Sequence, residues 1–177
     1  MSLLVCEKLH KVFGGLIAVN QVDLSIKQGE IVGLIGPNGA GKTTLFNLIT
    51  GFLPLTSGKI DYEGSDVTHL PPHILGEKGL VRTFQKINIF PDLSVLDNIL
   101  TGRYLHTRTD FLRSLFQTRT YHREEKQSRE KAFRILDFVG LSGWENHLAR
   151  KLAFGLQRAL GIASALAAEP KLLLLDE

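Results

Sequence analysis

The stretch GPNGAGKTT, residues 36–44, constrains the fold more than any other part of the sequence. It fits the pattern G-x-x-x-x-G-K-[ST]. The stretch before it, EIVGLIG (30–36), has the apolar run of a buried strand, and KTTLFNLITG (42–51) has helical spacing and ends at a glycine. Glycines let backbone N–H groups wrap phosphates, and a helix start favours anions. The order of strand, loop and helix therefore predicts a phosphate-binding loop in an α/β protein.

The phosphate loop predicts a nucleotide site with a metal ion. A glycine-rich turn that matches the pattern by accident is the alternative, with a chance of roughly one in two hundred for a chain of this length. Lys42 is expected to reach the β- and γ-phosphate oxygens of the nucleotide, and Thr43 to place its hydroxyl on Mg²⁺. The residues predicted to bind nucleotide in this loop are Gly36, Pro37, Asn38, Gly39, Ala40, Gly41, Lys42, Thr43 and Thr44.

The stretch KLLLLDE, residues 171–177, supplies the second half of the predicted site. Its leucines predict a buried strand at 172–175. Ligands of open α/β sheets bind beyond the carboxyl ends of the strands. Asp176 is therefore the expected partner of Mg²⁺, through water, and Glu177 the expected general base for an attacking water. Without a phosphate loop, both carboxylates would be interpreted as a solvated strand end.

Composition predicts one folded, soluble and cytosolic domain. The chain has 177 residues, of which 44% are hydrophobic and 22% charged, which is enough to bury one core. No apolar run approaches the roughly 18 to 20 residues that cross a bilayer, and the first residues break their hydrophobic stretch too early for a secretory signal. The one cysteine, Cys6, excludes an internal disulfide and is expected to be a small apolar residue of the first strand. A formal charge of +3 is too small to indicate nucleic acid.

The rest of the chain predicts a parallel-sheet core with a helical insertion. Strands are predicted from alternation at 3–9 and 18–26, and a short strand between glycines is predicted at 58–64. Helices are predicted after Pro71 and Pro72, from about 94 to Phe138, and at 156–168. His69 and His73 lack a carboxylate or cysteine at ligand spacing, so no metal is assigned to them. Trp144 is expected to be a packing anchor of the helical part.

Four features together resemble the ATP-binding cassette ATPases, the motor subunits of ABC transporters. They are the phosphate loop with KVFGGLIAV (11–19), VRTFQKINIFPDLSVLDN (81–98), LAFGLQ (152–157) and the terminal leucines with DE. The resemblance implies that Phe13 stacks on adenine, although a lone strand aromatic would be interpreted as core. It implies that Gln85 senses Mg²⁺ and the attacking water and links the site to membrane subunits.

The segment LAFGLQRALGIASAL resembles the signature segment of the family, usually close to LSGGQ. Gly155 and Gln157 fit, and the resemblance implies that this segment contacts the nucleotide held by the phosphate loop of a second cassette. Ala153 replaces the usual serine, and Leu156 departs from the polar residue that is usual there. The following helix has lost the charged residues common in the family, at Ala159, Gly161 and Ser164. A small-residue core helix is the alternative interpretation.

The resemblance also predicts the domain organisation. Residues 1–177 are interpreted as a single, incomplete cassette that is truncated after the Walker B strand, with a helical subdomain at about 86–160. In the family, a proline, a further strand and a histidine that contacts the γ-phosphate follow the DE pair. Their loss is expected to expose a hydrophobic sheet edge beside the phosphate-loop strand.

Within the family, the sequence is most similar to the ATPases of branched-chain amino-acid importers. The similarity lies in FGGLIAVNQVDLSI (13–26), GLVRTFQKINIF (79–90) and LAFG (152–155). A helical insertion at 102–131 carries many basic residues, for which a solvated face is the first interpretation, docking near anionic lipid the second and nucleic acid a poor third. Closely related cassettes serve urea-type or lipopolysaccharide transport.

The predicted function is an ATP-binding and ATP-hydrolysing subunit that powers solute import from the cytoplasmic face of the inner membrane. The resemblance implies ATP and Mg²⁺ as cofactors, a second cassette subunit and integral membrane permease subunits as partners, and no nucleic acid. One alternative is a nucleotide-binding piece without hydrolysis. Another is a soluble cassette of DNA repair or translation, which usually has tandem cassettes or coiled-coil inserts.

Overall fold

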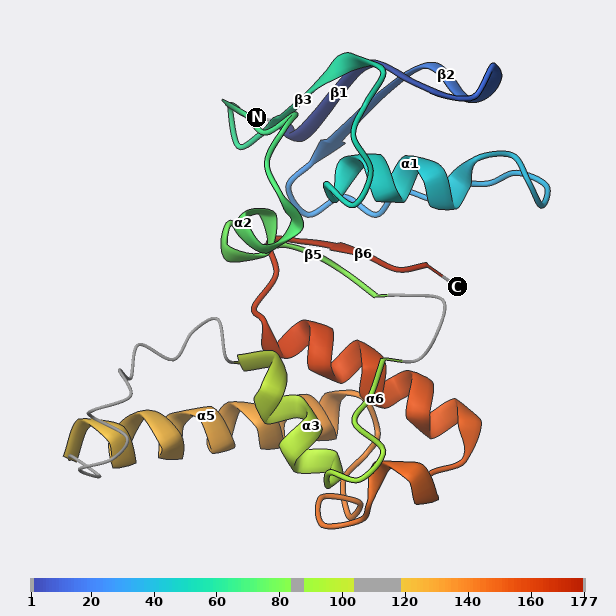
Figure 1. Cartoon of the computed structure of the whole chain (residues 1–177). Helices are drawn as coiled ribbons and strands as arrows, with labels where there is room; N and C mark the ends of the chain where they lie inside the picture. Colours follow the sequence, from blue (N-terminus) through green and yellow to red (C-terminus); the bar gives the residue numbers. More distant parts are fainter. Residues whose placement is uncertain (1, 84–87, 104–118, 177) are drawn as a thin grey trace. The chain divides into compact units, whose positions relative to one another are not determined.

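Two compact units make up this computed structural model, which describes residues 2–83, 88–103 and 119–176 (Figure 1). One unit contains residues 2–80 together with Asp176, and the other contains residues 81–175. The predicted nucleotide loop lies in the first unit and the predicted signature segment in the second. The assignment of one cassette domain with a helical subdomain at about 86–160 stays a prediction.

The first unit is built on an antiparallel sheet. Its strands are β1 (Ser2–Phe13), β2 (Leu16–Lys27), β3 (Ser57–Tyr62) and β4 (Ser65–Asp66), in the order β2-β1-β3-β4. Gly14 and Gly15 have φ of 50° and 94° and turn β1 into β2 within two residues. The strands predicted at 3–9, 18–26 and 58–64 are confirmed, and the first two are longer than predicted.

A bulge in β1 decides which of its side chains are buried. Leu4 and Cys6 are buried with the expected period of two, and then Leu9 and Lys11 are buried in place of the residues at 8 and 10. The shift coincides with a break in register between Cys6 and Leu9 and with φ of 46° at Lys8. A bulge of one residue exchanges the two faces of a strand. Burial also raises the pKa of the Cys6 thiol to about 12, as fits the predicted apolar role.

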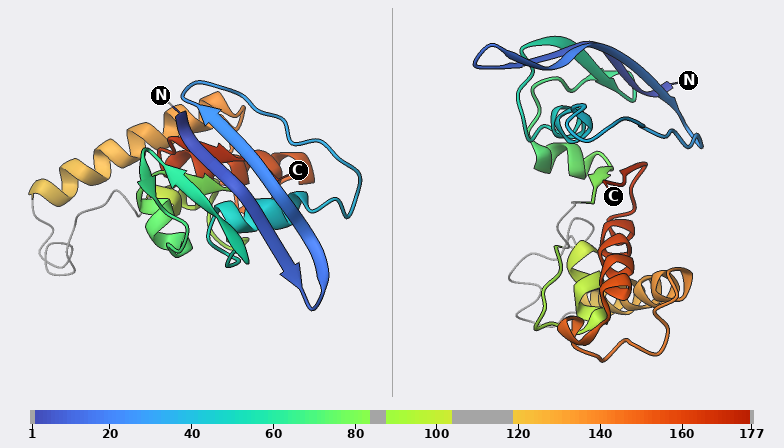
Figure 2. Two further views of the ribbon diagram at one scale, coloured as in Figure 1. Left: turned by 90° about the horizontal axis from the view of Figure 1, so that it is seen from above. Right: turned by 90° about the vertical axis from the view of Figure 1, so that its right-hand side faces the viewer.

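Helix α1 (Lys42–Ile49) lies against one side of this sheet (Figures 1 and 2). It buries Leu45, Leu48 and Ile49. It ends as predicted before Gly51, whose φ of 72° is the left-handed conformation of a helix terminus. The short helix α2 (Pro72–Glu77) begins at the second proline of the pair, also as predicted.

The strand predicted at 30–36 is wrong. Residues 31–37 have no regular secondary structure, and Ile31 and Ile35 are 99% and 94% exposed. Neither of the two sheets in the described part of the chain includes this segment. A buried parallel strand needs hydrogen-bonded neighbours and two covered faces. The expected exposed sheet edge beside a phosphate-loop strand is therefore not observed among the described residues, because the exposed apolar side chains belong to an irregular segment.

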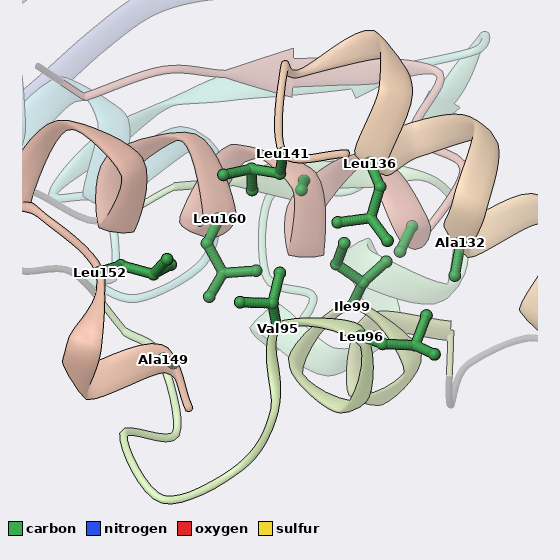
Figure 3. Packing of buried hydrophobic residues seen from close by; sticks show 11 residues of the cluster. Val95, Leu96, Ile99, Ala132, Leu136, Leu141, Ala149, Leu152 and Leu160 are labelled. Carbon is green, nitrogen blue, oxygen red and sulfur yellow. The ribbon is translucent and has the colours of Figure 1, made fainter. Parts of the chain in front are cut away.

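Helices dominate the second unit. They are α3 (Val95–Gly102), α5 (Arg119–Phe138), the short 3₁₀ helix η2 (Ala149–Lys151) and α6 (Phe154–Ala167). These bounds confirm the two helical predictions where the structure describes the chain. The helices share one apolar core (Figure 3), and Trp144 packs against it as predicted. The buried members of this core are Val95, Leu96, Ile99, Ala132, Leu136, Leu141, Ala149, Leu152, Leu160, Ala163 and Ala167.

Strands β5 (Leu80–Arg82) and β6 (Leu172–Leu174) form a second, two-stranded sheet and run in the same direction (Figure 1). The Thr83 N–H donates to the Leu174 carbonyl at 3.0 Å and extends the pairing. The strand predicted at 172–175 is therefore present but only partly buried. Leu172 and Leu173 are half-buried and Leu174 is buried, whereas Leu175 lies beyond the end of the strand and is 55% exposed.

Candidate nucleotide site

The phosphate loop closes onto the start of α1 at Gly41. Gly41 is the N-cap residue of α1 and has φ of 86°, a conformation that side chains rarely adopt. A Cβ at this position would also lie 2.4 Å from the carbonyl oxygen of Ala18 in β2. Only glycine meets both requirements, so the second glycine of the motif is fixed by this chain's own packing.

Ala18 is itself placed by an irregularity in β2. The Cα partners Lys11 with Val19 and Val12 with Ile17 leave Ala18 as an extra residue in the strand. Such a residue is unpaired in the ladder. Its carbonyl lies close to Gly41, so the backbone of β2 and the phosphate loop approach each other closely at this point.

The ammonium group of Lys42 lies inside the curve of the loop. Lys42 Nζ donates to the Gly36 carbonyl at 2.7 Å and to the Pro37 carbonyl at 3.0 Å. The Ala40 N–H donates to the Pro37 carbonyl at 3.2 Å and tightens the same turn. Two of the three ammonium donors are used by these carbonyls, which leaves one for an anion. The loop therefore presents a fixed positive charge at the position where the motif predicts phosphate.

The first turn of α1 is electrostatically suited to an anion. It contains no acidic residue, so the partial positive charge of the helix N-terminus is not neutralised there. Thr43 is exposed and Thr44 half-buried in this turn. The exposed Thr43 side chain and the positively charged loop are compatible with a metal-bound triphosphate, and the role of Thr43 toward Mg²⁺ stays a prediction.

Phe13 lies in the same unit as the phosphate loop. It ends β1 and its side chain is 43% exposed, which leaves part of the ring available to a base. The ammonium group of Lys11 lies over the ring, 5.0 Å from its centroid. Lys11 was not singled out by the sequence. Lys11 lies two residues before Phe13 in β1, and residues at this spacing in a strand share a face. This spacing was the sequence signal that could have indicated a contact between the two side chains.

The predicted signature segment forms the start of α6 in the second unit. A Cβ on Gly155 would meet nothing within 4 Å, so this glycine is not required by the packing of the described chain. The Gln157 side-chain amide donates to the Leu152 carbonyl at 3.0 Å, which gives it a local structural contact. Phe154 is 63% exposed, and the Arg158 guanidinium lies 4.9 Å from its ring centroid.

Three of the departures from the family pattern in α6, at Leu156, Ala159 and Ser164, have contacts with the rest of the second unit. Leu156 and Ala159 both pack against the apolar core of the second unit. The hydroxyl of Ser164 donates to the Asn98 carbonyl in α3 at 3.2 Å. Apolar and small residues at these positions therefore contribute to the packing of α6 against its neighbours.

The remaining predicted residues lie near or beyond the limits of the description. Gln85 and Glu177 lie outside the described residues, so their predicted roles stay predictions. Asp176 is half-buried and belongs to the unit of the phosphate loop. Its role toward Mg²⁺ also stays a prediction, as do the contacts of Gly155 and Gln157 with nucleotide.

Comparison with known proteins gives a family for these features. Residues 19–177 match the protein family described as ABC transporter. The chain belongs to the ABC transporter family. This ABC protein is 43% identical over 165 residues to the high-affinity branched-chain amino acid transport ATP-binding protein BraF of Pseudomonas aeruginosa. It is 39% identical over 175 residues to the corresponding protein LivG of Salmonella typhimurium.

The fold also matches solved ABC cassettes. A nucleotide-free ATP-binding cassette from an ABC transporter superposes with a TM-score of 0.81 at 37% identity, covering 100% of this chain and 69% of that one. An ATP-binding cassette of an ABC transporter in its ADP conformation gives a TM-score of 0.81 at 37% identity. This match covers 98% of this chain and 67% of that one. The ABC fold predicted from the sequence is confirmed.

This ABC chain is shorter than its relatives. The matched residues cover 93% of the chain but 65% of BraF, and 99% of the chain but 69% of LivG. None of the helices in the described ranges is long and apolar enough to cross a membrane.

Proposed function

We propose that this chain is the nucleotide-binding part of a subunit that hydrolyses ATP to drive an ABC importer. The observation that carries the proposal is the loop at 36–42, which curls around the Lys42 ammonium and leads into a helix start with no acidic residue. Anions bind at such helix starts, and a triphosphate is the anion that the loop motif predicts.

The proposed chemistry is in-line hydrolysis of the γ-phosphate. The loop amides and Lys42 would hold the phosphates, and Phe13 would hold the base. Mg²⁺, bound to the Thr43 hydroxyl and to Asp176 through water, would neutralise phosphate charge when present. Gln85 would orient the attacking water and Glu177 would accept its proton. The bond between the γ-phosphorus and the β–γ bridging oxygen then breaks, and ADP and phosphate leave.

A second copy or a related cassette is proposed to complete the site. The open space at Gly155 supports this, because glycine in a helix costs about 1 kcal/mol relative to alanine and no packing in the described chain requires it. Gly155 and Gln157 would then approach a nucleotide held by the other cassette. Permease subunits in the membrane would receive the motion, with the cassettes on the cytoplasmic face.

Nucleotide binding and turnover by the chain test this proposal directly. Lys42→Ala should weaken ATP binding about 10- to 100-fold, since a charge-assisted contact to phosphate is lost. Lys78→Ala, which changes an exposed lysine after α2, is the matched control and should bind as the parent does. Calorimetric titration with Mg²⁺ and ATP measures affinity, and phosphate release measures turnover.

The outcomes separate the proposal from its alternative. Turnover by the parent chain that Lys42→Ala abolishes would support an ATPase. Binding that depends on Lys42 without phosphate release would favour a nucleotide-binding piece without hydrolysis. Absence of ATP binding by a folded parent chain would contradict both the ATPase and the nucleotide-binding piece.

Branched-chain amino acids are the proposed cargo, because BraF and LivG are the relatives named for that transport. In a BraF chimera, the sequence of this chain can replace the part of BraF to which it aligns. The chimera can be expressed in cells that lack BraF. Restored uptake of labelled leucine, isoleucine and valine is expected, with the Lys42→Ala chimera as the inactive control. A chimera that binds ATP but restores no uptake would favour another ABC system, such as urea-type or lipopolysaccharide transport.

A further inference from the structure

Lys11 is a lysine buried inside a strand. Its side chain is 9% exposed, and burying an ammonium group is costly unless it is hydrogen-bonded or paired. It faces inward because the bulge at Lys8 exchanges the faces of β1, so that Leu9 and Lys11 continue the buried side. The strand therefore directs this charge inward by a specific irregularity in its backbone.

The ammonium group of Lys11 has two contacts that are far apart in the sequence. Its Nζ donates to the carbonyl of Pro54 at 2.6 Å. It also lies 5.0 Å from the centroid of the Phe13 ring. A cation over an aromatic face is attracted by the electrons of the ring, and more strongly when both are partly desolvated. Lys11 therefore occupies one face of the Phe13 ring.

Pro54 is in turn fixed to the helix that follows the phosphate loop. The Leu53 N–H donates to the Asn47 carbonyl of α1 at 3.1 Å, and Gly51 closes the helix end. Two residues after Pro54, Thr56 donates its N–H to the His10 carbonyl at 3.0 Å. The segment at 51–56 is thus anchored to α1 on one side and to β1 on the other.

We propose that Lys11 is a positioning residue that holds the Phe13 ring as the platform for the adenine base. It would keep this platform at a fixed place relative to the phosphate loop, through Pro54 and α1. The inference rests on the proposed nucleotide binding. It predicts that Lys11 contributes to recognition of the base and not to recognition of the phosphates, which Lys42 holds.

Two ligands separate these contributions. ATP contains base and phosphates, whereas inorganic tripolyphosphate contains only the phosphates. Lys11→Met keeps an unbranched side chain of similar length and removes the charge. It should weaken ATP binding about fivefold, in line with a partly buried cation–π contact, and leave tripolyphosphate affinity within about twofold. Calorimetric titrations of the full chain in the same magnesium buffer measure both.

Further variants distinguish positioning from folding. Lys11→Arg can keep both the hydrogen bond and the ring contact, and it should restore most of the ATP affinity. Phe13→Leu should weaken ATP binding, and the double variant Phe13→Leu with Lys11→Met should bind as Phe13→Leu alone does, since both act on one contact. If Lys11→Met does not fold, Lys11→Gln takes its place in the titrations, because the glutamine amide can still donate to the Pro54 carbonyl.

Each outcome decides the proposal. Equal weakening of ATP and tripolyphosphate by Lys11→Met would show a structural role for Lys11 and overturn the inference. Unchanged ATP affinity in a folded Lys11→Met or Lys11→Gln variant would also overturn it. A parent chain that binds neither ligand would instead contradict the proposed function.

Discussion

Glu169 follows helix α6 in a left-handed conformation, with φ of 50°. A side chain in this conformation costs about 1 kcal/mol relative to glycine. Its carboxylate has two cationic partners that offset this cost. Arg103 Nη1 donates to Glu169 Oε1 at 2.8 Å, and Lys131 Nζ donates to the same oxygen. The hydrogen bond from Arg103, followed by that from Lys131, holds the pKa of Glu169 at about 2, below its ordinary value of 4.5. One side chain thus joins α3, α5 and the end of α6.

This low pKa predicts an acid-dependent contribution to stability. The charged form is favoured in the folded state, so the contribution is present above pH 4.5 and is lost as the pH falls toward 2. Because the Glu169 side chain is 43% exposed, solvent screening limits the contribution to about 1 kcal/mol. Glu169→Gln should lower the free energy of unfolding by this amount at pH 6 and by less at pH 3.5. Urea unfolding followed by fluorescence of Trp144, the one tryptophan of the chain, measures both.

Glu130→Gln, an exposed carboxylate on α5, is the matched control and should change stability little at either pH. An equal loss for Glu169→Gln at pH 6 and pH 3.5 would show that the carboxylate charge does not stabilise the unit.

At the scale of elements, α3 and α6 cross at very short range. A Cβ on Gly102 of α3 would lie 2.1 Å from the carbonyl oxygen of Ser164 in α6. On the same helix, the buried Asn98 side chain donates to the Phe90 carbonyl at 3.0 Å and accepts from the Phe90 N–H at 2.7 Å. Asn98 thereby fixes the loop that enters α3, and Gly102 sets the distance to α6.

Two glycines of these helices should respond in opposite ways to the same substitution. Gly102→Ala places a methyl group against backbone and should destabilise the second unit by about 2 kcal/mol. Gly161→Ala places a methyl group where nothing lies within 4 Å and should stabilise it by about 1 kcal/mol through helix propensity. Trp144 fluorescence during urea unfolding measures both. Destabilisation by Gly161→Ala would mean that α6 packs more tightly there than the structure shows.

At the scale of the whole molecule, the sequence predicted the features whose cause is local. The strands of the β1–β2 hairpin follow from alternation, α1 follows from its apolar spacing, and the Lys42 loop follows from its glycines. The strand at 30–36 could not be predicted correctly, because an apolar run becomes a strand only beside other strands. Lys11 was missed because its contact is also non-local: its hydrogen-bond acceptor, the Pro54 carbonyl, is 43 residues away in the chain.

The exposed segment at 31–35 has a consequence for the behaviour of the chain in solution. Ile31 and Ile35 are almost fully exposed and lie beside a valine and a leucine that are 43% and 41% exposed. Contiguous exposed apolar residues promote association between molecules. The double variant Ile31→Ser with Ile35→Ser should therefore reduce light scattering on heating and reduce binding of a hydrophobic dye. It should leave the unfolding midpoint of the first unit within about 2 °C, since exposed side chains contribute little to stability.

Leu45→Ser, at a core position of α1 that is 4% exposed, is the matched control for this experiment. It should lower the free energy of unfolding by about 3 kcal/mol, because it leaves a cavity and buries a hydroxyl group. If the isoleucine variant lost stability to a similar extent, the segment would be packed in solution. If it kept its stability and still associated as the parent does, association would depend on a different surface. Reduced association at unchanged stability is the result that the irregular, solvent-exposed course of residues 31–35 requires.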